Sequence, residues 1–224
     1  MIKFSKTLKI NARSWSIEAG MPSKGGTCPA SINPNTGEFV DACKGCYAMA
    51  GNYRFPNVKA PRIHNKEDWK RSEWVSDMVA ELDNDRYFRW FDSGDMYDLR
   101  LAKKMLQVME QTPHCNYWLP TRMHKFNKFM PVIKAMQALP NVVVRLSSDS
   151  VTGGVINTDL PNSTIIPTSE QATSSMTICH SYDNEGKCGS CRACWSKDVK
   201  TIAYVAHGRS MAKVIRLIDL KEAA

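Results

Sequence analysis

Long hydrophobic runs are missing from this sequence. Nowhere do about eighteen consecutive apolar residues occur, the length that a transmembrane helix needs, so no membrane-spanning segment is expected. The start, MIKFSKTLKINARSW, includes basic side chains but lacks the continuous apolar segment of a secretory signal. Internal repeats and low-complexity tracts are absent as well. These absences predict a cytoplasmic protein, and in that compartment thiols stay reduced.

Basic residues outnumber acidic ones. The 224 residues include 30 Lys and Arg against 22 Asp and Glu, which gives a net charge of +8. This balance favours polyanionic partners such as nucleic acid, although it also suits anionic small molecules. The hydrophobic share of 43% is enough for a packed core, and the length corresponds to one large domain over residues 1–224.

Short apolar runs alternate with amphipathic segments along most of the chain. Helical spacing of apolar side chains is found in 67–82, 98–111 and 125–139. The strand candidates are 14–19, 86–92, 116–120, 141–147, 163–168 and 201–206. Strands separated by helices of this length indicate βαβ units. The expected fold class is therefore α/β, either a partial (β/α)6-type barrel or an open parallel sheet, with a Cys-rich C-terminal loop.

Polar residues follow three of the expected strands. In both candidate architectures, active sites lie at the carboxyl ends of parallel strands, so we expect these polar groups to lie close together. They are Asp92, Ser93, Gly94 and Asp95 after the second strand, Thr121 and Arg122 after the third, and Ser147, Ser148 and Asp149 after the fourth.

The segment CHSYDNEGKCGSCRACW, residues 179–195, is dense in cysteine. Its thiols are Cys179, Cys188, Cys191 and Cys194, with the spacing C-x8-C-x2-C-x2-C. Zinc sites normally use separate C-x2-C pairs, whereas successive x2 spacings are typical of ferredoxin-like clusters, whose iron corners accept one thiolate each. We therefore interpret 179–195 as a cluster-binding insertion that holds a 4Fe–4S cluster, in preference to zinc or to disulfides.

A second group, Cys28, Cys43 and Cys46, has only three members. It falls in the Gly-, Pro- and Asn-rich stretch 20–45 and just beyond it, which we expect to be loop. Three thiolates could bind three irons of another cluster and leave the fourth open to a substrate, as catalytic metal sites do. Alternatively Cys115, His64 or His114 completes a closed shell, and the sequence leaves both arrangements open. The default for Cys115, at the start of a strand, is a small buried hydrophobe.

Four motifs carry a family resemblance. TCPAS, CKGCYA, WFDSGDMYD and YWLPTR, together with the Cys-rich tail, resemble the bacteriophage gene product 88 family over nearly the whole chain. The resemblance implies that the protein is phage-encoded and acts in the cytoplasm of a host bacterium.

More distantly, the arrangement resembles the radical S-adenosylmethionine (SAM) enzymes, which have a partial α/β barrel and, in some members, an auxiliary cluster. This resemblance implies that Cys28, Cys43 and Cys46 hold a cluster whose open iron receives SAM. Ser93, Gly94 and Asp95 match the motif that contacts the methionine amino group. Arg122 and Ser148 then meet the SAM carboxylate or ribose.

Three functions follow as hypotheses. The first is an enzyme that cleaves SAM reductively, with a flavodoxin or ferredoxin as electron donor and a small molecule or nucleic acid as substrate. The second is an electron-transfer or structural protein with one or two clusters and no SAM. The third is a metal-containing nucleic-acid module that uses the net charge and the basic stretch 54–71. The helical spacing of Trp69 and Trp74 indicates core positions rather than stacking platforms.

Overall fold

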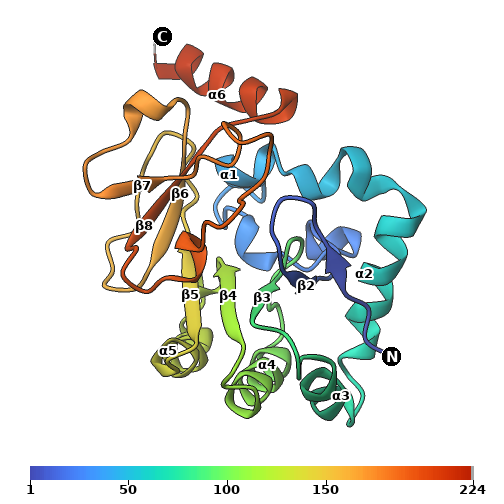
Figure 1. The fold of residues 1–224 in the computed structure, drawn as a ribbon. Coiled ribbons are helices and arrows are strands. Elements are labelled where there is room, and N and C mark those ends of the chain that lie inside the picture. Colours follow the sequence, from blue (N-terminus) through green and yellow to red (C-terminus); the bar gives the residue numbers. More distant parts are fainter. Residues whose placement is uncertain (223–224) are drawn as a thin grey trace.

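The structure, a computed structural model, describes residues 1–222 and is built around one sheet of eight strands (Figure 1). The strands are β1 (Ser5–Lys6), β2 (Arg13–Trp15), β3 (Tyr87–Trp90), β4 (Asn116–Thr121), β5 (Val142–Ser147), β6 (Asn162–Ile166), β7 (Met176–Ile178) and β8 (Thr201–Val205). Their order in the sheet is β1-β2-β3-β4-β5-β6-β8-β7. Only β1 and β2 pair antiparallel, and every other neighbouring pair is parallel.

The expected α/β class with a mostly parallel sheet is confirmed. From β2 to β6 each strand pairs with the next one in the sequence. A parallel neighbour requires a crossover connection, and the chain makes most of these crossovers through helices. The helices are α1 (Asp41–Lys44), α2 (Pro56–Asp68), α3 (Trp74–Glu81), α4 (Leu99–Gln111), α5 (Met130–Ala138) and α6 (Arg209–Glu222). Of these, α3, α4 and α5 lie side by side next to β3, β4 and β5 (Figure 1).

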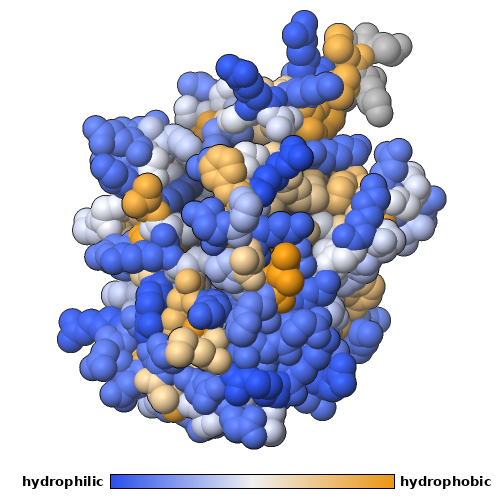
Figure 2. Space-filling model, turned by 90° about the vertical axis from the view of Figure 1, so that its right-hand side faces the viewer, coloured by the Kyte–Doolittle hydropathy of each residue, from blue (hydrophilic) through white to orange (hydrophobic). Residues whose placement is uncertain are grey.

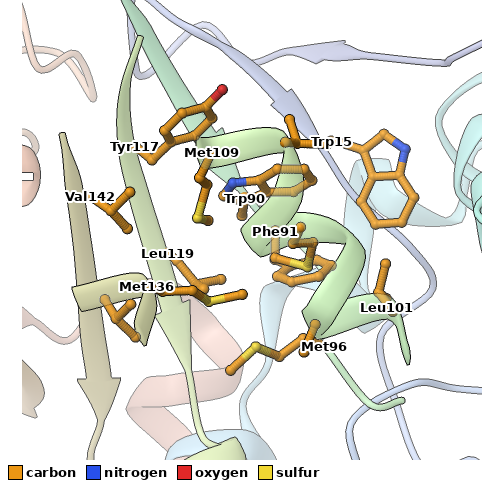
Figure 3. Packing of buried hydrophobic residues seen from close by; sticks show 14 of the residues in the cluster. Trp15, Trp90, Phe91, Met96, Leu101, Met109, Tyr117, Leu119, Met136 and Val142 are labelled. Atoms are coloured by element: carbon orange, nitrogen blue, oxygen red, sulfur yellow. The ribbon is translucent and has the colours of Figure 1, made fainter. Parts of the chain in front are cut away.

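The main core lies between these helices and one face of the sheet. Trp90 lies between Trp15 and Tyr117 (Figure 3), with ring centroids 6.0 Å and 6.1 Å from theirs. Leu119 and Met136 extend the same cluster toward α5, and all five of these side chains have no exposed surface. The strands supply this layer from alternate positions, since successive side chains of a strand point to opposite faces.

The opposite face of the sheet carries Arg89, Trp118 and Arg145. Each of the three alternates along its strand with residues of the main core. Arg89, for example, stands between the core residues Phe88 and Trp90 in the sequence of β3. The chain between β7 and β8 covers this face, because Trp195 packs edge-to-face on Trp118 at 5.3 Å between ring centroids. The Cys-rich segment thus lies against the sheet on the side away from α3, α4 and α5.

Several expected elements differ from the structure. The single helix expected over 67–82 is wrong, because α2 ends at Asp68 and α3 begins at Trp74. In the intervening turn, Arg71 Nη2 donates hydrogen bonds to both Asp68 and Asp77, at 3.3 Å and 2.7 Å. The stretch 20–45 is not loop throughout, since α1 forms within it.

Helix α2 escaped detection because its buried positions are polar. Arg62, Asn65 and Asp68 are its buried residues, so the sequence carries no apolar stripe there. Helix α6 and the short strands β1 and β7 were also not expected. Strands of two or three residues are too short to show an alternating pattern of apolar side chains in the sequence.

The face of the molecule drawn in Figure 2 is predominantly hydrophilic. The face in Figure 2 carries its hydrophobic residues in separate small groups surrounded by polar ones. Across the described part of the chain, no helix is both long and apolar enough to cross a membrane.

Candidate functional site

The segment between Cys28 and Cys43 folds back on itself like a β-hairpin. Ile32 and Phe39 form an antiparallel bridge, and the Val40 N–H donates to the Ser31 carbonyl at 2.8 Å. The fourteen residues between Cys28 and Cys43 therefore form a folded-back loop, and its end returns toward its start. Cys43 lies in α1, and the Cys46 N–H donates to the Cys43 carbonyl at 3.2 Å.

The three thiols are largely enclosed and influence one another. Burial raises the pKa of Cys28 to about 12, and the negative charges of Asp95, Cys43 and Cys46 add to the rise. Burial also raises the pKa of Cys43 and of Cys46, while the Arg122 guanidinium acts in the opposite direction on both. A metal that binds these thiols must therefore displace protons that the bare site holds tightly.

Arg122 connects this thiol group to the end of β5. Its guanidinium donates to the Ser148 carbonyl at 2.9 Å and lies 3.3 Å from Asp149 Oδ1. Lys125 Nζ donates to Asp149 Oδ2 at 2.6 Å, and the Asp149 carbonyl accepts from the Ala42 N–H at 3.0 Å. These contacts tie β4, β5 and α1 together, and they hold two cations beside Cys43.

Asp95 lies on the other side of Arg122. Its carboxylate accepts hydrogen bonds from Thr121 Oγ1 at 2.6 Å, from the Arg122 N–H at 2.9 Å and from the Met96 N–H at 2.8 Å. Burial raises the pKa of Asp95, and these hydrogen bonds oppose the rise. The carboxylate thus joins the ends of β3 and β4 and contributes negative charge next to Cys28.

Ser93 and Asp92 connect β3 to α2. Ser93 Oγ donates to the Ile17 carbonyl at 2.7 Å and accepts from Arg62 Nε at 2.8 Å. Arg62 Nη2 also donates to both Asp92 carboxylate oxygens, at 3.1 Å and 2.9 Å, and the two side chains are 7% and 1% exposed. Arg62 is a site residue that the sequence did not reveal, because nothing in a basic stretch marks one cation as buried.

Gly94 allows the end of β3 to approach the loop that leads to Cys28. Its φ is +79°, and a Cβ built on it would lie 2.5 Å from Ile17 Cγ1 and 2.7 Å from Thr27 Oγ1. Any other residue would push against the residue next to Cys28. Ser148 has a comparable internal role, since its hydroxyl donates to the Gly154 carbonyl at 2.6 Å.

The expected strand-end residues are therefore brought together. The polar atoms of Ser93, Asp95 and Ser148 already have partners within the protein. Among the buried side-chain atoms of the described residues, Arg122 Nε and Asp149 Oδ1 lack a hydrogen-bond partner despite their proximity. Arg122 is thus the expected residue whose side chain retains an unused donor.

The four C-terminal cysteines gather in a second place. Cys194 Sγ lies 3.6 Å from the Tyr204 hydroxyl. Burial raises the pKa of Cys194 to about 11, and the nearby Arg145 and Arg89 guanidiniums act against the rise. Burial raises the pKa of Cys188 too, with further contributions from the charges of Cys179 and Cys191. These mutual influences link all four thiols of the segment 179–195.

The residues considered as a fourth ligand for the N-terminal group lie elsewhere. Cys115 is fully buried at the amino end of β4 and belongs to the main core. His114 Nε2 is 3.1 Å from the Leu82 carbonyl, and His64 Nε2 is 3.0 Å from the Met1 carbonyl. None of these three side chains completes a shell around Cys28, Cys43 and Cys46 in this structure.

Thiols are the donors that soft metals and iron–sulfur clusters prefer. Within residues 1–222, no three His, Cys, Asp or Glu side chains are grouped closely enough to hold one metal ion. The chemistry of both donor sets, three thiols beside Arg122 and four thiols beside Arg145, fits an anionic metal–thiolate centre. Cations stabilise such a centre by offsetting its charge.

The fold defines a mixed α/β protein, and seven of its cysteines fall into these two groups. The family model of gene product 88 matches residues 2–197, and the chain belongs to that family. Neither the curated proteins nor the solved structures contain a significant match.

Proposed function

We propose that this protein is an iron–sulfur protein with an open-iron 4Fe–4S cluster on Cys28, Cys43 and Cys46. The proposal is supported by the mutual charge effects of these three buried thiols and by their proximity to Arg122, which follows β4. A three-thiol shell leaves one iron free for an external ligand. Because Cys115, His64 and His114 lie elsewhere, we favour the open arrangement over the closed one.

SAM is the external ligand that the proposal assigns to the open iron. Bound to a reduced cluster, SAM supplies a hydrogen-abstracting radical. Arg122 would meet its carboxylate as a nearby cation, because the guanidinium lies close to Cys43 and Cys46 while it pairs with Asp149 at 3.3 Å. Ser93, Gly94, Asp95 and Ser148 would shape the pocket by holding the strand ends in place. The consecutive order of β2 to β6 supports a partial barrel of the radical-enzyme type.

The second part of the proposal is a 4Fe–4S cluster on Cys179, Cys188, Cys191 and Cys194. It would be fully ligated by protein and would exchange electrons with the open cluster or with a donor of the flavodoxin or ferredoxin class. If SAM does not bind, the same two groups make an electron-transfer or structural protein. That alternative is favoured by the complete thiol set of the second group.

A nucleic-acid module has weaker support. Most cations of the stretch 54–71 already contact acidic groups: Arg62 pairs with Asp92, Lys59 and Lys66 with Glu18, Lys70 with Glu67, and Arg71 with Asp68 and Asp77. Trp69 and Trp74 are buried in the core and offer no face for stacking. A nucleic acid is retained only as one substrate class of the enzyme, beside small molecules.

Electron paramagnetic resonance tests the proposal. Anaerobically reconstituted, dithionite-reduced protein is expected to give a cluster signal that changes on addition of SAM. The triple variant Cys28→Ala, Cys43→Ala, Cys46→Ala should lose both the SAM-dependent change and part of the iron. Cys115→Ala is the matched control, because it removes a thiol that lies apart from both groups.

Two results would count against the proposal. If the iron content is equal in the wild type and the triple variant, the hypothesis of an N-terminal cluster is wrong. If the cluster signal does not change on addition of SAM, the SAM-cleaving enzyme is rejected in favour of the electron-transfer or structural protein.

A further inference from the structure

Two arginines lie beneath the Cys-rich segment without a carboxylate partner. Arg145 is fully buried and Arg89 is partly buried, both on the sheet face that this segment covers. In the described part of the chain, the arginines that form ion pairs are Arg13, Arg62, Arg71, Arg100 and Arg122. A buried cation without an anion is costly, and burial accordingly lowers the pKa of Arg145. Among the described residues, Arg145 therefore has no negatively charged carboxylate beside it, and Arg89 has only the charge of Asp92, a carboxylate that forms its ion pair with Arg62.

Hydrogen-bond donors are unused on the same face. Arg89 Nε, Trp118 Nε1 and Arg145 Nε are buried and have no partner. The three residues come from adjacent strands, with Arg89 opposite Trp118 in the register and Arg145 opposite Pro120. The Arg89 guanidinium also lies 4.4 Å from the Trp118 ring centroid. Buried donors without acceptors are rare in folded proteins, so a cluster of three calls for an acceptor.

The unpaired cations lie beside the cysteines. Arg145 Nη2 donates to the Ala193 carbonyl at 3.3 Å and to the Ser196 carbonyl at 3.2 Å, on either side of Cys194. The charges of Arg145 and Arg89 both act on the Cys194 thiol, and that of Arg89 also acts on Cys188. The thiolates of the Cys-rich segment are thus a source of negative charge for both guanidiniums, in addition to the Asp92 carboxylate that acts on Arg89.

We infer that Arg89, Trp118 and Arg145 form an anion-binding surface for the cluster held by Cys179, Cys188, Cys191 and Cys194. The inference rests on the proposed function and assigns these residues a role in it. A four-iron core with four thiolates carries net negative charge, which increases when the cluster is reduced. The two guanidiniums offset that charge, and the unused N–H groups can donate to cluster or cysteine sulfur. Both effects favour the reduced form, so this surface raises the reduction potential of the C-terminal cluster.

The test is an EPR-monitored redox titration of the full-length chain. Cys28, Cys43 and Cys46 are replaced by Ala in the background, so that the signal comes only from the C-terminal group. Arg145→Gln and Arg89→Gln are each expected to weaken the reduced form about tenfold, a fall in midpoint potential of about 59 mV for one electron. Arg145→Lys should shift the potential less, because it keeps the charge.

The matched control is Arg86→Gln, an exposed arginine just before β3. It changes net charge by the same amount and should leave the potential unchanged. Two substituted positions are tested because Arg145 also donates to backbone carbonyls, whereas the Arg89 guanidinium donates to the Tyr47 hydroxyl at 3.5 Å.

The outcomes separate the inference from the proposed function. If the iron-loaded Arg89→Gln and Arg145→Gln proteins have the same potential as the parent protein, the inference is overturned and the C-terminal cluster remains supported. If the parent protein itself binds no iron at 179–195, the proposed C-terminal cluster fails, and the inference fails with it.

Discussion

Gly94 occupies a position where backbone conformation and packing both exclude a side chain. Its φ of +79° lies in the left-handed region, and its absent Cβ faces Ile17 and Thr27. The absence of a side chain thus lets the end of β3 approach the loop that carries Cys28. The residue therefore acts on the cysteine site through the approach of two backbones.

Gly94→Ala is expected to destabilise the protein by about 2–4 kcal/mol, because backbone strain and overpacking add. Urea unfolding measures the change in free energy of unfolding. Gly37→Ala is the control, since Gly37 has a φ of +68° with no atom within 4 Å of the built Cβ. Gly37→Ala introduces the backbone strain without the overpacking. An equal loss of unfolding free energy in both variants would contradict the close approach of β3 to the Cys28 loop.

The Arg62–Asp92 pair is buried, so removing one partner leaves an uncompensated charge. Arg62→Met should lower the free energy of unfolding by about 3–5 kcal/mol. The measurement is again urea unfolding. Lys70→Met serves as the control, because the Lys70 and Glu67 side chains are 48% and 66% exposed and such a pair contributes little. Similar losses in the two variants would mean that the Arg62 pair is not buried in solution.

At the scale of elements, the start of α4 follows directly from its sequence. Asp98 is the N-cap, and its carboxylate accepts from the Arg100 N–H at 2.8 Å and from Arg100 Nη2 at 2.7 Å. Chiefly through the Arg100 side-chain hydrogen bond, the pKa of Asp98 falls below its ordinary value of 3.8. A carboxyl whose folded pKa is depressed stabilises the fold above its unfolded pKa, and this contribution is lost as the pH falls through the folded pKa.

Asp98→Ala should therefore cost about 1 kcal/mol at neutral pH, the usual value of a helix cap. The difference from wild type should shrink when urea unfolding is repeated at about pH 3, because the carboxyl of the unfolded chain, with its ordinary pKa of 3.8, then binds a proton that the folded form resists. Asp98→Asn keeps a capping oxygen and is expected to lose less than Asp98→Ala. A difference that stays constant with pH would show that the charge contributes nothing.

At the scale of the whole molecule, two parts of the chain differ in how they are stabilised. The sheet and α3, α4 and α5 enclose a continuous apolar core. In contrast, Ser181 is the only buried residue of the segment 179–195. Such a segment has little apolar surface to stabilise it, so in our proposal its bound cluster supplies the missing order.

Removal of metal by a chelator should thus expose this segment to trypsin and leave the core intact. Cleavage is expected after Lys187 and Arg192 in the stripped protein and should be suppressed in the reconstituted protein. Lys103, exposed on α4, is the internal control and should stay uncut in both. Mass spectrometry of the fragments measures the result, and equal cleavage of both forms at Lys187 would show that no metal orders the segment.

Part of this protein could be read from its sequence. The period of apolar residues identified α4, α5 and the central strands, because burial on one face imposes a period of two or 3.6 residues. The α/β class followed from their alternation. The strand-end groups Asp92 to Asp95 and Arg122 were expected near one another, since parallel strands end at the same edge. Family membership followed from four short motifs, of which only TCPAS and CKGCYA contain cysteine, and from the Cys-rich tail.

Tertiary structure decided what local pattern does not encode. Helix α2 buries Arg62, Asn65 and Asp68, so its stability depends on partners distant in the sequence. The exclusion of Cys115 from both thiol groups depends on which end of β4 it occupies. The unpaired cations Arg89 and Arg145 became visible only once strand register placed them beneath the Cys-rich segment. Sequence fixes which groups are present, whereas burial and distance determine which charges are left for a ligand to neutralise.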